Sequence, residues 1–513
     1  MCVAQRRLTA GAAGEGLAQV DFVTDLDVRR ERFSTPTSKA SVERLRARGK
    51  LLARERIDLL CDPGTFFEVG QLTHEPGIVD REVTEPVAPS DGAVTGIGEI
   101  DGIRVCIAAD DATVFGGARG AIADRKINRL RRMAAKGGMP FIALQEGSAG
   151  RIQETVGAVA AGVGDSLKFH HDLKGQVPTV AAIMGHCFGG PAFFAAMSDF
   201  VPMVDGTSYI AMSGPPVIRA GTGQDVSVEE IGGSALHGKR TGLVDLVARD
   251  EVECLNSIRR YLSFACRPEI PPSDAADRPT PELEEIVPVN FRQAYDMRSV
   301  LAAVLDDGDF FEMKRDFGQN LLTAFGRIEG RTVGVVASQP LHRAGMIEQS
   351  TARKAIAFIE LCERMAIPLV FVQDVPGFHV GKEVEENGQV RDATDLICAV
   401  MSATVPKVTC ILRKSYGLSY LALGGKDMGA DFVFAWPTAE IGLMGPEAAD
   451  RVMSGKGATP EEIAERTQVY RSQMSPYIAA GNGHIDDVIA PAETRRALAS
   501  ALRACTPQAR TTT

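Results

Sequence analysis

The residues best placed to do chemistry in this chain belong to a glycine-rich turn. Residues 185–191 (GHCFGGP) follow the apolar run 180–184 and lead into an apolar helix. Small residues let a ligand approach the backbone closely, and Pro191 suits the first helical turn, where its missing N–H is not needed. The amides of Gly189 and Gly190 are therefore predicted to stabilise a developing oxyanion above the helix start. A tight strand-to-helix turn, with glycine for packing, is the alternative.

A second turn of the same kind occurs 228 residues later. Residues 415–420 (SYGLSY) follow the apolar run 408–412, in register with the first turn. Two candidate oxyanion holes are harder to explain as turn geometry than one. They predict a reaction whose two partners each pass through an enolate-like anion, one held by each half of the chain.

Side-chain catalysts are scarce by comparison. The sequence has no Gly-x-Ser-x-Gly elbow, no Walker loop and no dinucleotide-binding glycine fingerprint. Glu146 and Glu154 could form an acid/base pair of hydratase type, or else a structural ion pair or a helix-start carboxylate. His186 and His237 could line the pocket or serve as structural histidines, while Trp436 lies in an apolar run that predicts core. Backbone amides are thus the better catalytic candidates.

The two turns belong to a longer internal repeat. Residues 139–146 (MPFIALQE) return as 367–374 (IPLVFVQD), and roughly ninety residues repeat without an insertion. A period of 228 residues far exceeds that of solenoid repeats, so it predicts two copies of a whole domain. Continuous apolar runs such as 141–144 predict strands buried on both faces. The helical spacing that precedes this run ends at Gly137-Gly138. The predicted fold class is α/β.

Composition limits the remaining classes. The 513 residues carry a net charge of −10, which argues against nucleic-acid binding, and no apolar run is long enough to span a membrane. The basic stretches 44–56 and 125–132 are interpreted as solvated helix faces. Residues 1–40 predict a loose arm, 268–281 a proline-rich linker between the repeats, and 506–513 a frayed end. The ten cysteines show no metal-ligand spacing and no disulfide framework. This pattern argues against a metal site and favours a reducing, cytoplasmic compartment.

The chain also resembles a known family. From about Val20 to Leu502 it is similar to the β subunits of biotin-dependent acyl-CoA carboxylases, the carboxyltransferases of propionyl-CoA and methylcrotonyl-CoA type. Residues 213–217 (SGPPV), with Gly232, Gly233 and His237, look closest to the methylcrotonyl branch. The other segments that carry the resemblance, in the order expected for the family, are 48–50 (RGK), 53–57 (ARERI), 113–117 (TVFGG), 151–154 (RIQE), 374–378 (DVPGF), 405–409 (VPKVT) and 436–440 (WPTAE).

The resemblance implies a fold and a reaction. The fold would be two tandem crotonase-like (ClpP/crotonase) domains related by internal duplication, at 20–284 and 285–508. Acyl-CoA would be bound mainly by the first domain and carboxybiotin mainly by the second. The implied reaction moves CO₂ from carboxybiotin to the α (or vinylogous γ) carbon of an acyl-CoA thioester through backbone oxyanion holes.

Site residues follow from the same resemblance. The thioester oxygen would be held by Gly189 and Gly190, and the ureido oxygen of biotin by Leu418 and Ser419. Leu418 replaces a glycine of the family and would be strained if its position required φ > 0. Leu421 replaces an aspartate that is common in short-chain enzymes, so a different acyl pocket is expected. The residues expected to bind coenzyme A and the acyl group are Phe115, Gly116, Gly117, Gly150, Arg151 and Leu421.

The resemblance also implies partners. No Ala-Met-Lys-Met biotinylation sequence and no ATP-binding glycine loop occurs, so a separate biotin carboxylase/biotin carboxyl carrier subunit is expected. Family sites form between the first domain of one subunit and the second domain of another, usually in a hexamer. Two alternatives stay open. One is a biotin-dependent acyl-CoA decarboxylase or transcarboxylase, and the other is a non-catalytic scaffold subunit, motivated by Leu418 and the altered loop 147–150.

Overall fold

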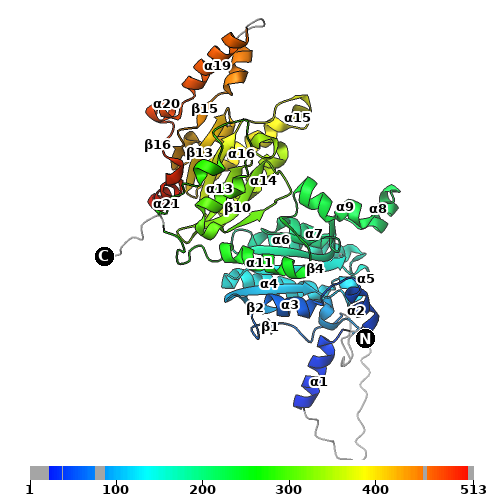
Figure 1. Ribbon diagram of the computed structural model, residues 1–513. Helices are drawn as coiled ribbons and strands as arrows, with labels where there is room; N and C mark the ends of the chain where they lie inside the picture. The colour runs from blue at the N-terminus through cyan, green and yellow to red at the C-terminus, as the bar shows by residue number, and fades with distance from the viewer. Residues whose placement is uncertain are drawn as a thin grey trace, which may run out of the picture.

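Two α/β domains follow one another along the chain, the first in blue to green and the second in green to red (Figure 1). The computed structural model describes residues 22–36, 38–75, 87–148, 150–275, 277–453 and 459–505. Most of the predicted N-terminal arm and all of the predicted frayed end, 506–513, lie outside the described residues.

The first domain is built on an eight-stranded sheet. Its strand order is β1-β2-β3-β4-β5-β6-β8, with β7 paired to β5. The pairs from β3 to β8 are parallel, and these strands are largely buried because helices pack on the sheet. The strands are β1 (Phe67–Glu68), β2 (Ala93–Ile100), β3 (Ile103–Asp110), β4 (Phe141–Ser148), β5 (Thr179–Phe188), β6 (Pro202–Val204), β7 (Tyr209–Ala211) and β8 (Leu246–Ala248).

The second domain repeats this sheet strand for strand. Its order is β9-β10-β11-β12-β13-β14-β16, with β15 paired to β13 in the place of β7. The predicted duplication of a whole α/β domain is therefore confirmed. The strands are β9 (Phe310–Met313), β10 (Leu321–Ile328), β11 (Arg331–Ser338), β12 (Leu369–Val375), β13 (Lys407–Tyr416), β14 (Phe432–Ala435), β15 (Glu440–Gly442) and β16 (Asp487–Val488).

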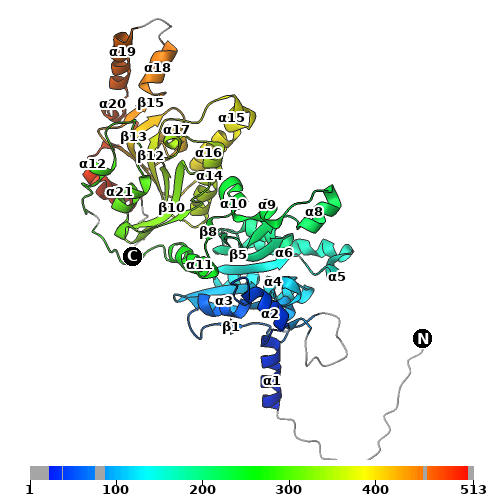
Figure 2. The ribbon, with the colours of Figure 1, turned by 45° about the vertical axis from the view of Figure 1, so that its right-hand side comes forward.

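Helices cover the sheets and also project from them. In both views α8 and α9 extend from the first domain and α18 and α19 from the far end of the second (Figures 1 and 2). The part of the predicted loose arm that is described contains a helix, α1. The first-domain helices are α1 (Phe22–Ser34), α2 (Lys39–Arg46), α3 (Ala53–Leu60), α4 (Ala121–Gly137), α5 (Ile152–Thr155), α6 (Gly164–Leu173), α7 (Gly190–Met197), α8 (Pro215–Thr222), α9 (Val228–Gly232), α10 (Ser234–Leu236) and α11 (Glu251–Ala265). The second-domain helices are α12 (Leu283–Ile286), α13 (Met297–Val304), α14 (Gln349–Arg364), α15 (Lys382–Glu386), α16 (Gln389–Ser402), α17 (Ser419–Ala422), α18 (Pro446–Met453), α19 (Pro460–Gln473), α20 (Pro476–Gly481) and α21 (Thr494–Ala504).

Local sequence explains where these elements end. Helix α4 ends as predicted, because Gly138 adopts φ 60° and donates its N–H to the carbonyls of the last turn. Strand β5 runs beyond the predicted apolar run to Phe188, because residues 186–188 pair with β7. The glycine turn begins where that extra pairing stops.

A shared hydrophobic core joins the two domains. One buried cluster includes Phe200 and Tyr261, which stack at 4.8 Å, together with Phe325 and Phe358, which lie 5.0 Å apart. The first pair belongs to the first domain and the second pair to the second. Because the core is continuous, the two domains are packed together rather than loosely tethered.

The segment between the domains is anchored to the second domain. The carbonyl of Pro268 accepts the N–H of Thr332 at 2.7 Å, and Leu283 is buried in the core of the second domain. The expected boundary at 284/285 falls inside α12, and we retain a division in this segment as a proposal. Trp436 is 2% exposed, as its apolar surroundings predict, and donates to Thr494 Oγ1 at 3.0 Å.

Candidate active site

The first predicted turn lies between β5 and α7. Gly189 has φ 68° and ψ −132°, a conformation that favours glycine. Its N–H donates to the carbonyls of Ala211 at 3.3 Å and Met212 at 3.1 Å. Within the described part of the chain, the N–H of Gly190 has no such acceptor. The prediction of two free donors is therefore wrong for Gly189, which shapes the turn, and Gly190 is the amide left available.

The second predicted turn has the same geometry between β13 and α17. Gly417 has φ 65° and donates its N–H to the carbonyl of Gly442 at 2.8 Å. Leu418 has φ −67° and ψ −10°, so the expected strain at this leucine is absent. Over the described ranges, the amides of Leu418 and Ser419 have no acceptor. Both therefore remain as candidate donors, and the side chain of Leu418 is 60% exposed.

The two turns explain why one copy has glycine and the other leucine at the same place. Gly190 and Leu418 are separated by the repeat length of 228 residues. A Cβ added to Gly190 would meet no atom within 4 Å. The position thus tolerates a side chain in both copies, whereas the positive φ belongs to the preceding glycine.

A close backbone contact fixes the loop that faces the first turn. A Cβ at Gly117 would lie 1.9 Å from the carbonyl oxygen of Glu146, and a Cβ at Gly147 would lie 2.0 Å from that of Gly117. Only glycine fits at both positions. Strand β4 pairs Ser148 with Phe188 of β5, so this loop emerges beside the Gly189-Gly190 turn. Ala149, part of the altered loop, lies outside the described residues.

Arg151 helps to hold this loop in place. Its backbone N–H donates to Arg119 at 2.8 Å, next to the isolated bridge between Arg119 and Gly150. Its guanidinium contacts Asp91 at 3.0 Å and Glu154 at 2.5 Å, and it lies 4.9 Å from the ring centroid of Phe115. Because the arginine is 7% exposed and Phe115 is 55% exposed, the ring, and not the guanidinium, faces outward.

Glu146 belongs to a buried ion-pair network. Lys50 and Arg56 each contact its carboxylate at 2.5 Å, and Arg56 also contacts Glu251 at 2.6 Å. Burial lowers the pKa of Lys50 and the neighbouring carboxylate of Glu146 opposes that shift. Glu154 is engaged separately, with Arg151 and with the N–H of Ala121 at 2.8 Å. The structural ion-pair alternative therefore explains both glutamates better than an acid/base pair.

A basic cavity of about 300 Å³ opens beside this network. Arg44 donates to Ser41 at 2.8 Å, and neither Arg44 nor Arg48 pairs with a carboxylate in the described chain. The interpretation of 44–56 as a solvated helix face is thus wrong for Lys50 and Arg56, which are buried, whereas Arg44 and Arg48 are exposed, as predicted, and line a cavity. The cavity is lined by Ser41, Arg44, Leu45, Arg48, Lys50, Ala112, Gly116, Glu146, Gly185, His186 and Thr207.

Sequence reasoning missed this cavity because the distant α2 forms one of its walls. His186 lines it, in agreement with one of its two interpretations, and burial lowers the pKa of His186 with Lys50 and Arg48 adding to the shift. His237 lies elsewhere, with Nδ1 3.0 Å from Thr241 Oγ1. The RGK motif at 48–50 was the available signal in the sequence, but only the folded structure shows that this segment lines a cavity together with residues of β5. The other basic stretch, 125–132, likewise contains two buried side chains, Lys126 and Arg131.

The candidate residues form two groups in different domains. Phe115, Gly116, Gly117, Gly150 and Arg151 come together around the loop that faces the first turn. Leu418, Ser419 and Leu421 lie at or within α17 of the second domain, and Figure 2 shows this helix beside β12 and β13, well away from β5 of the first domain, which α7 directly follows. One chain therefore contains two half-sites that do not meet.

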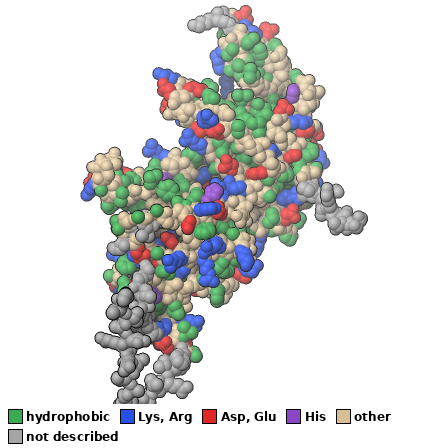
Figure 3. Space-filling view, turned by 180° about the vertical axis from the view of Figure 1, so that it is seen from behind, with side chains coloured by type: hydrophobic (Ala, Val, Ile, Leu, Met, Phe, Trp, Pro, Cys, Tyr) green, Lys and Arg blue, Asp and Glu red, His purple; other side chains and the backbone are tan. Residues whose placement is uncertain are grey.

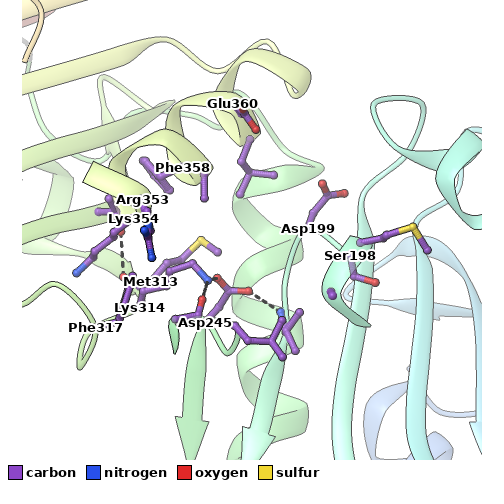
Figure 4. A pocket seen from close by; sticks show the side chains of 18 of the residues that line it. Ser198, Asp199, Asp245, Met313, Lys314, Phe317, Arg353, Lys354, Phe358 and Glu360 are labelled. Carbon is purple, nitrogen blue, oxygen red and sulfur yellow. Dashed lines mark hydrogen bonds and ion pairs between the residues drawn. The ribbon is translucent and has the colours of Figure 1, made fainter. Parts of the chain in front are cut away.

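A cavity of about 290 Å³ at the seam between the domains contains none of these candidates. Figure 4 shows Lys314 joined there to Asp245, and the two groups are 2.8 Å apart. Arg364 and Asp199 form a second ion pair across the seam at 3.0 Å. These contacts hold one domain against the other and are separate from both half-sites.

None of the helices in the described ranges has the length and apolarity needed to cross a bilayer. These ranges contain no group of three or more His, Cys, Asp or Glu side chains arranged for a metal ion. The nine cysteines within them are free thiols.

Comparison with known proteins identifies the class. The carboxyl transferase domain model matches residues 44–513, and the chain belongs to this family. It is 38% identical to the propionyl-CoA carboxylase carboxyltransferase subunit of Haloferax mediterranei, over 94% of this chain and 96% of that protein. It is 36% identical to the methylmalonyl-CoA decarboxylase subunit alpha of Propionigenium modestum, over 93% of this chain and 95% of that protein.

A solved structure supports the same assignment. The transcarboxylase 12S hexamer, with methylmalonyl-coenzyme A and methylmalonic acid bound, is similar with a TM-score of 0.89 and 36% identity, over 97% of this chain and 99% of that chain. The predicted class is confirmed. This chain is a biotin-dependent acyl-CoA carboxyltransferase with two tandem crotonase-like domains.

Proposed function

We propose that the first domain holds an acyl-CoA thioester, that the second holds carboxybiotin, and that CO₂ passes from biotin to the acyl group. The observation that carries this proposal is the pair of equivalent turns. In the described chain, each presents backbone N–H groups without an acceptor, at Gly190 in one and at Leu418 and Ser419 in the other. Such preorganised donors stabilise anions that develop during a reaction.

The basic cavity supports acyl-CoA binding by the first domain. Coenzyme A carries phosphate groups, and Arg44 and Arg48 offer guanidinium groups that match phosphate geometry. Gly116 connects this cavity to the exposed ring of Phe115. Phosphates in the cavity would thus place the rest of the ligand next to the loop that faces Gly190.

The chain's own contribution to the reaction is electrostatic. The N–H of Gly190 would donate to the thioester oxygen as charge builds up when the α-proton is removed. The amides of Leu418 and Ser419 would donate to the ureido oxygen of biotin as CO₂ leaves the neighbouring nitrogen. Carboxybiotin, when bound, supplies the CO₂ and then the nitrogen base that takes the α-proton, so one N–C bond breaks and one C–C bond forms.

The acyl group is the least constrained part of the proposal. Leu421 lies in α17, two residues after Ser419, and presents an apolar side chain where related short-chain enzymes commonly have an aspartate. Relatives named for propionyl-CoA and methylmalonyl-CoA make these thioesters the first candidates to test.

A second copy of the chain would bring the half-sites together. The shared core fixes the two domains, so α7 and α17 of one chain cannot close on each other. Large apolar side chains are exposed near each half-site, including Phe193 and Met212 in the first domain and Leu418 and Leu443 in the second. Figure 3 also shows hydrophobic side chains over the far end of the second domain. We propose a homo-oligomer, a hexamer like the related 12S assembly.

The remaining partner and the location are proposed on chemical grounds. The chain carries no biotinylation sequence, so biotin would arrive on a separate carrier and carboxylase subunit. Free thiols throughout the described ranges agree with a reducing, cytoplasmic compartment.

One observation favours a second candidate function. The decarboxylase subunit from Propionigenium modestum is 36% identical to this chain over nearly its full length. The same two half-sites could run in the direction of decarboxylation or transcarboxylation. Net carboxylation that requires ATP and bicarbonate, with the natural partner, would favour the carboxylase, whereas CO₂ loss without ATP would favour the alternative.

The experiment that tests the proposal uses the purified full chain with a biotinylated carrier, its carboxylase, bicarbonate, ATP and propionyl-CoA. Formation of a carboxylated CoA product is expected. Failure with every carrier and acyl chain tried, from protein shown to be folded, would leave the scaffold alternative.

A further inference from the structure

A buried glutamine lies behind the second oxyanion turn. Gln373, in β12, is 0% exposed. Its Nε2 donates to the carbonyls of Leu423 at 2.7 Å and Tyr420 at 3.3 Å, and its Oε1 accepts from Ser415 Oγ at 2.6 Å. Two acceptors on one side and a hydroxyl on the other fix the orientation of the carboxamide. This one side chain therefore links β12, β13 and α17.

Helix α17 needs such outside support because it is only four residues long. Its own hydrogen bonds include those from Ala422 to Leu418 at 3.0 Å and from Leu423 to Ser419 at 3.1 Å. A helix this short is marginal by itself, and its last carbonyls have no partner within the helix. Gln373 satisfies two of these carbonyls. The direction of the amides at the opposite end of α17 therefore depends on the glutamine.

The first copy provides a natural comparison. Gln145 is the equivalent residue, and its Oε1 accepts from Cys187 Sγ at 2.7 Å, as Gln373 does from Ser415. In the described structure, Gln145 donates to no carbonyl of α7. Helix α7 has eight residues and completes more of its own hydrogen bonds. The glutamine is repeated, but only the second copy uses it to hold the helix.

From this difference we infer that Gln373 is a positioning residue for the second oxyanion hole, acting through α17 on the amides of Leu418 and Ser419. The inference rests on the proposed function, in which these amides hold the ureido oxygen of biotin. Loss of Gln373 would disturb the biotin half-site alone. Acyl-CoA binding depends on the other domain and would be unchanged.

The test uses four variants of the full chain: Gln373→Leu, Ser415→Ala, Ser415→Cys and the matched control Gln145→Leu. In biotin-dependent turnover of a malonyl-type CoA, Gln373→Leu should lower kcat/KM for biotin by about 10- to 100-fold, since small misplacements of reacting groups cost this much. Its calorimetric Kd for acyl-CoA should equal that of the parent. Gln145→Leu should leave kcat/KM for biotin unchanged.

The Ser415 pair tests the orientation of the carboxamide by rescue. Ser415→Ala removes the hydroxyl that donates to Gln373 and should lower kcat/KM for biotin. Ser415→Cys should restore it, because the first copy already pairs a thiol with the same amide oxygen. If Gln373→Leu fails to fold, this pair decides the question alone.

Any of three results would overturn the inference. They are a parental kcat/KM for biotin in Gln373→Leu, a loss of kcat/KM in Gln145→Leu equal to that in Gln373→Leu, and the same kcat/KM in the two Ser415 variants. If the wild-type chain itself shows no biotin-dependent turnover, the proposed function fails instead. Hydrogen exchange over 417–423 then tests the positioning role, with faster exchange in Gln373→Leu expected and unchanged exchange overturning it.

Discussion

Replacing Gly190 by proline should remove the one available donor of the first oxyanion turn and leave the turn itself in place. Proline suits the first residue of a helix, where Gly190 stands. The residue before a proline is restricted, but Gly189 at φ 68° and ψ −132° has the mirror image of the extended conformation preferred there. Gly190→Pro should therefore fold.

The expected effect follows from the loss of one hydrogen-bond donor. Removing a donor from an oxyanion hole costs about 10² to 10³ in kcat, or roughly 2.7–4 kcal/mol of transition-state stabilisation. Gly190→Ala is the matched control, because it keeps the N–H, its Cβ meets nothing within 4 Å, and Leu418 shows that the equivalent position accepts a side chain. The alanine variant should have nearly the parental kcat.

The assay is steady-state turnover of a malonyl-type CoA with biotin, with circular dichroism and thermal melts as checks on folding. The informative quantity is the ratio of kcat between the alanine and proline variants. A ratio near one, with both proteins folded, would refute the assignment of the donor to Gly190. Equal losses in both variants would instead show that the position matters for packing.

Three further predictions follow from buried or basic side chains. Glu146→Gln removes the carboxylate that pairs with two buried cations and should lower the free energy of unfolding by about 3–5 kcal/mol in urea titrations. Near-parental stability would revive the role of Glu146 as an acid or base. Arg48→Ala should raise the KM for acyl-CoA by about 10-fold or more through the loss of a charge-assisted phosphate contact, while an unchanged KM would place coenzyme A elsewhere. Burial lowers the pKa of Lys354 from 10.5 to about 7. Between pH 7 and 10.5 the lysine therefore carries a proton in the unfolded chain but not in the folded one, and the free energy of unfolding should rise with pH across this window. Lys354→Met should flatten that rise in pH-dependent melts, and an identical slope in both proteins would contradict the assignment.

The sequence predicted the architecture well because the duplication constrains every strand twice. The apolar runs at 141–144 and 369–372 fall in β4 and β12, and the two sheets share one strand order. The predicted length of β5 was too short, since its end pairs with β7, and the sequence holds no local sign of that contact.

The site was predicted less completely, for reasons that lie in the backbone. The amide of Gly189 is taken by carbonyls at 211 and 212, an interaction set by tertiary pairing rather than by local sequence. The expected strain at Leu418 was misplaced by one residue, because the positive φ belongs to Gly417. Lys50 and Arg56 were interpreted as solvated because helical spacing does not reveal that both are buried against the carboxylate of Glu146.

The most direct test of the account is biotin-dependent CO₂ release by the isolated wild-type protein from a panel that includes methylmalonyl-CoA. Release that requires free biotin and yields the decarboxylated acyl-CoA is the predicted result, because it needs both half-sites, brought together by copies of this chain, and no separate carrier subunit. Folded protein that binds the thioester but releases no CO₂ with biotin, across the whole panel, would contradict the claim that the two turns form one carboxyltransferase site.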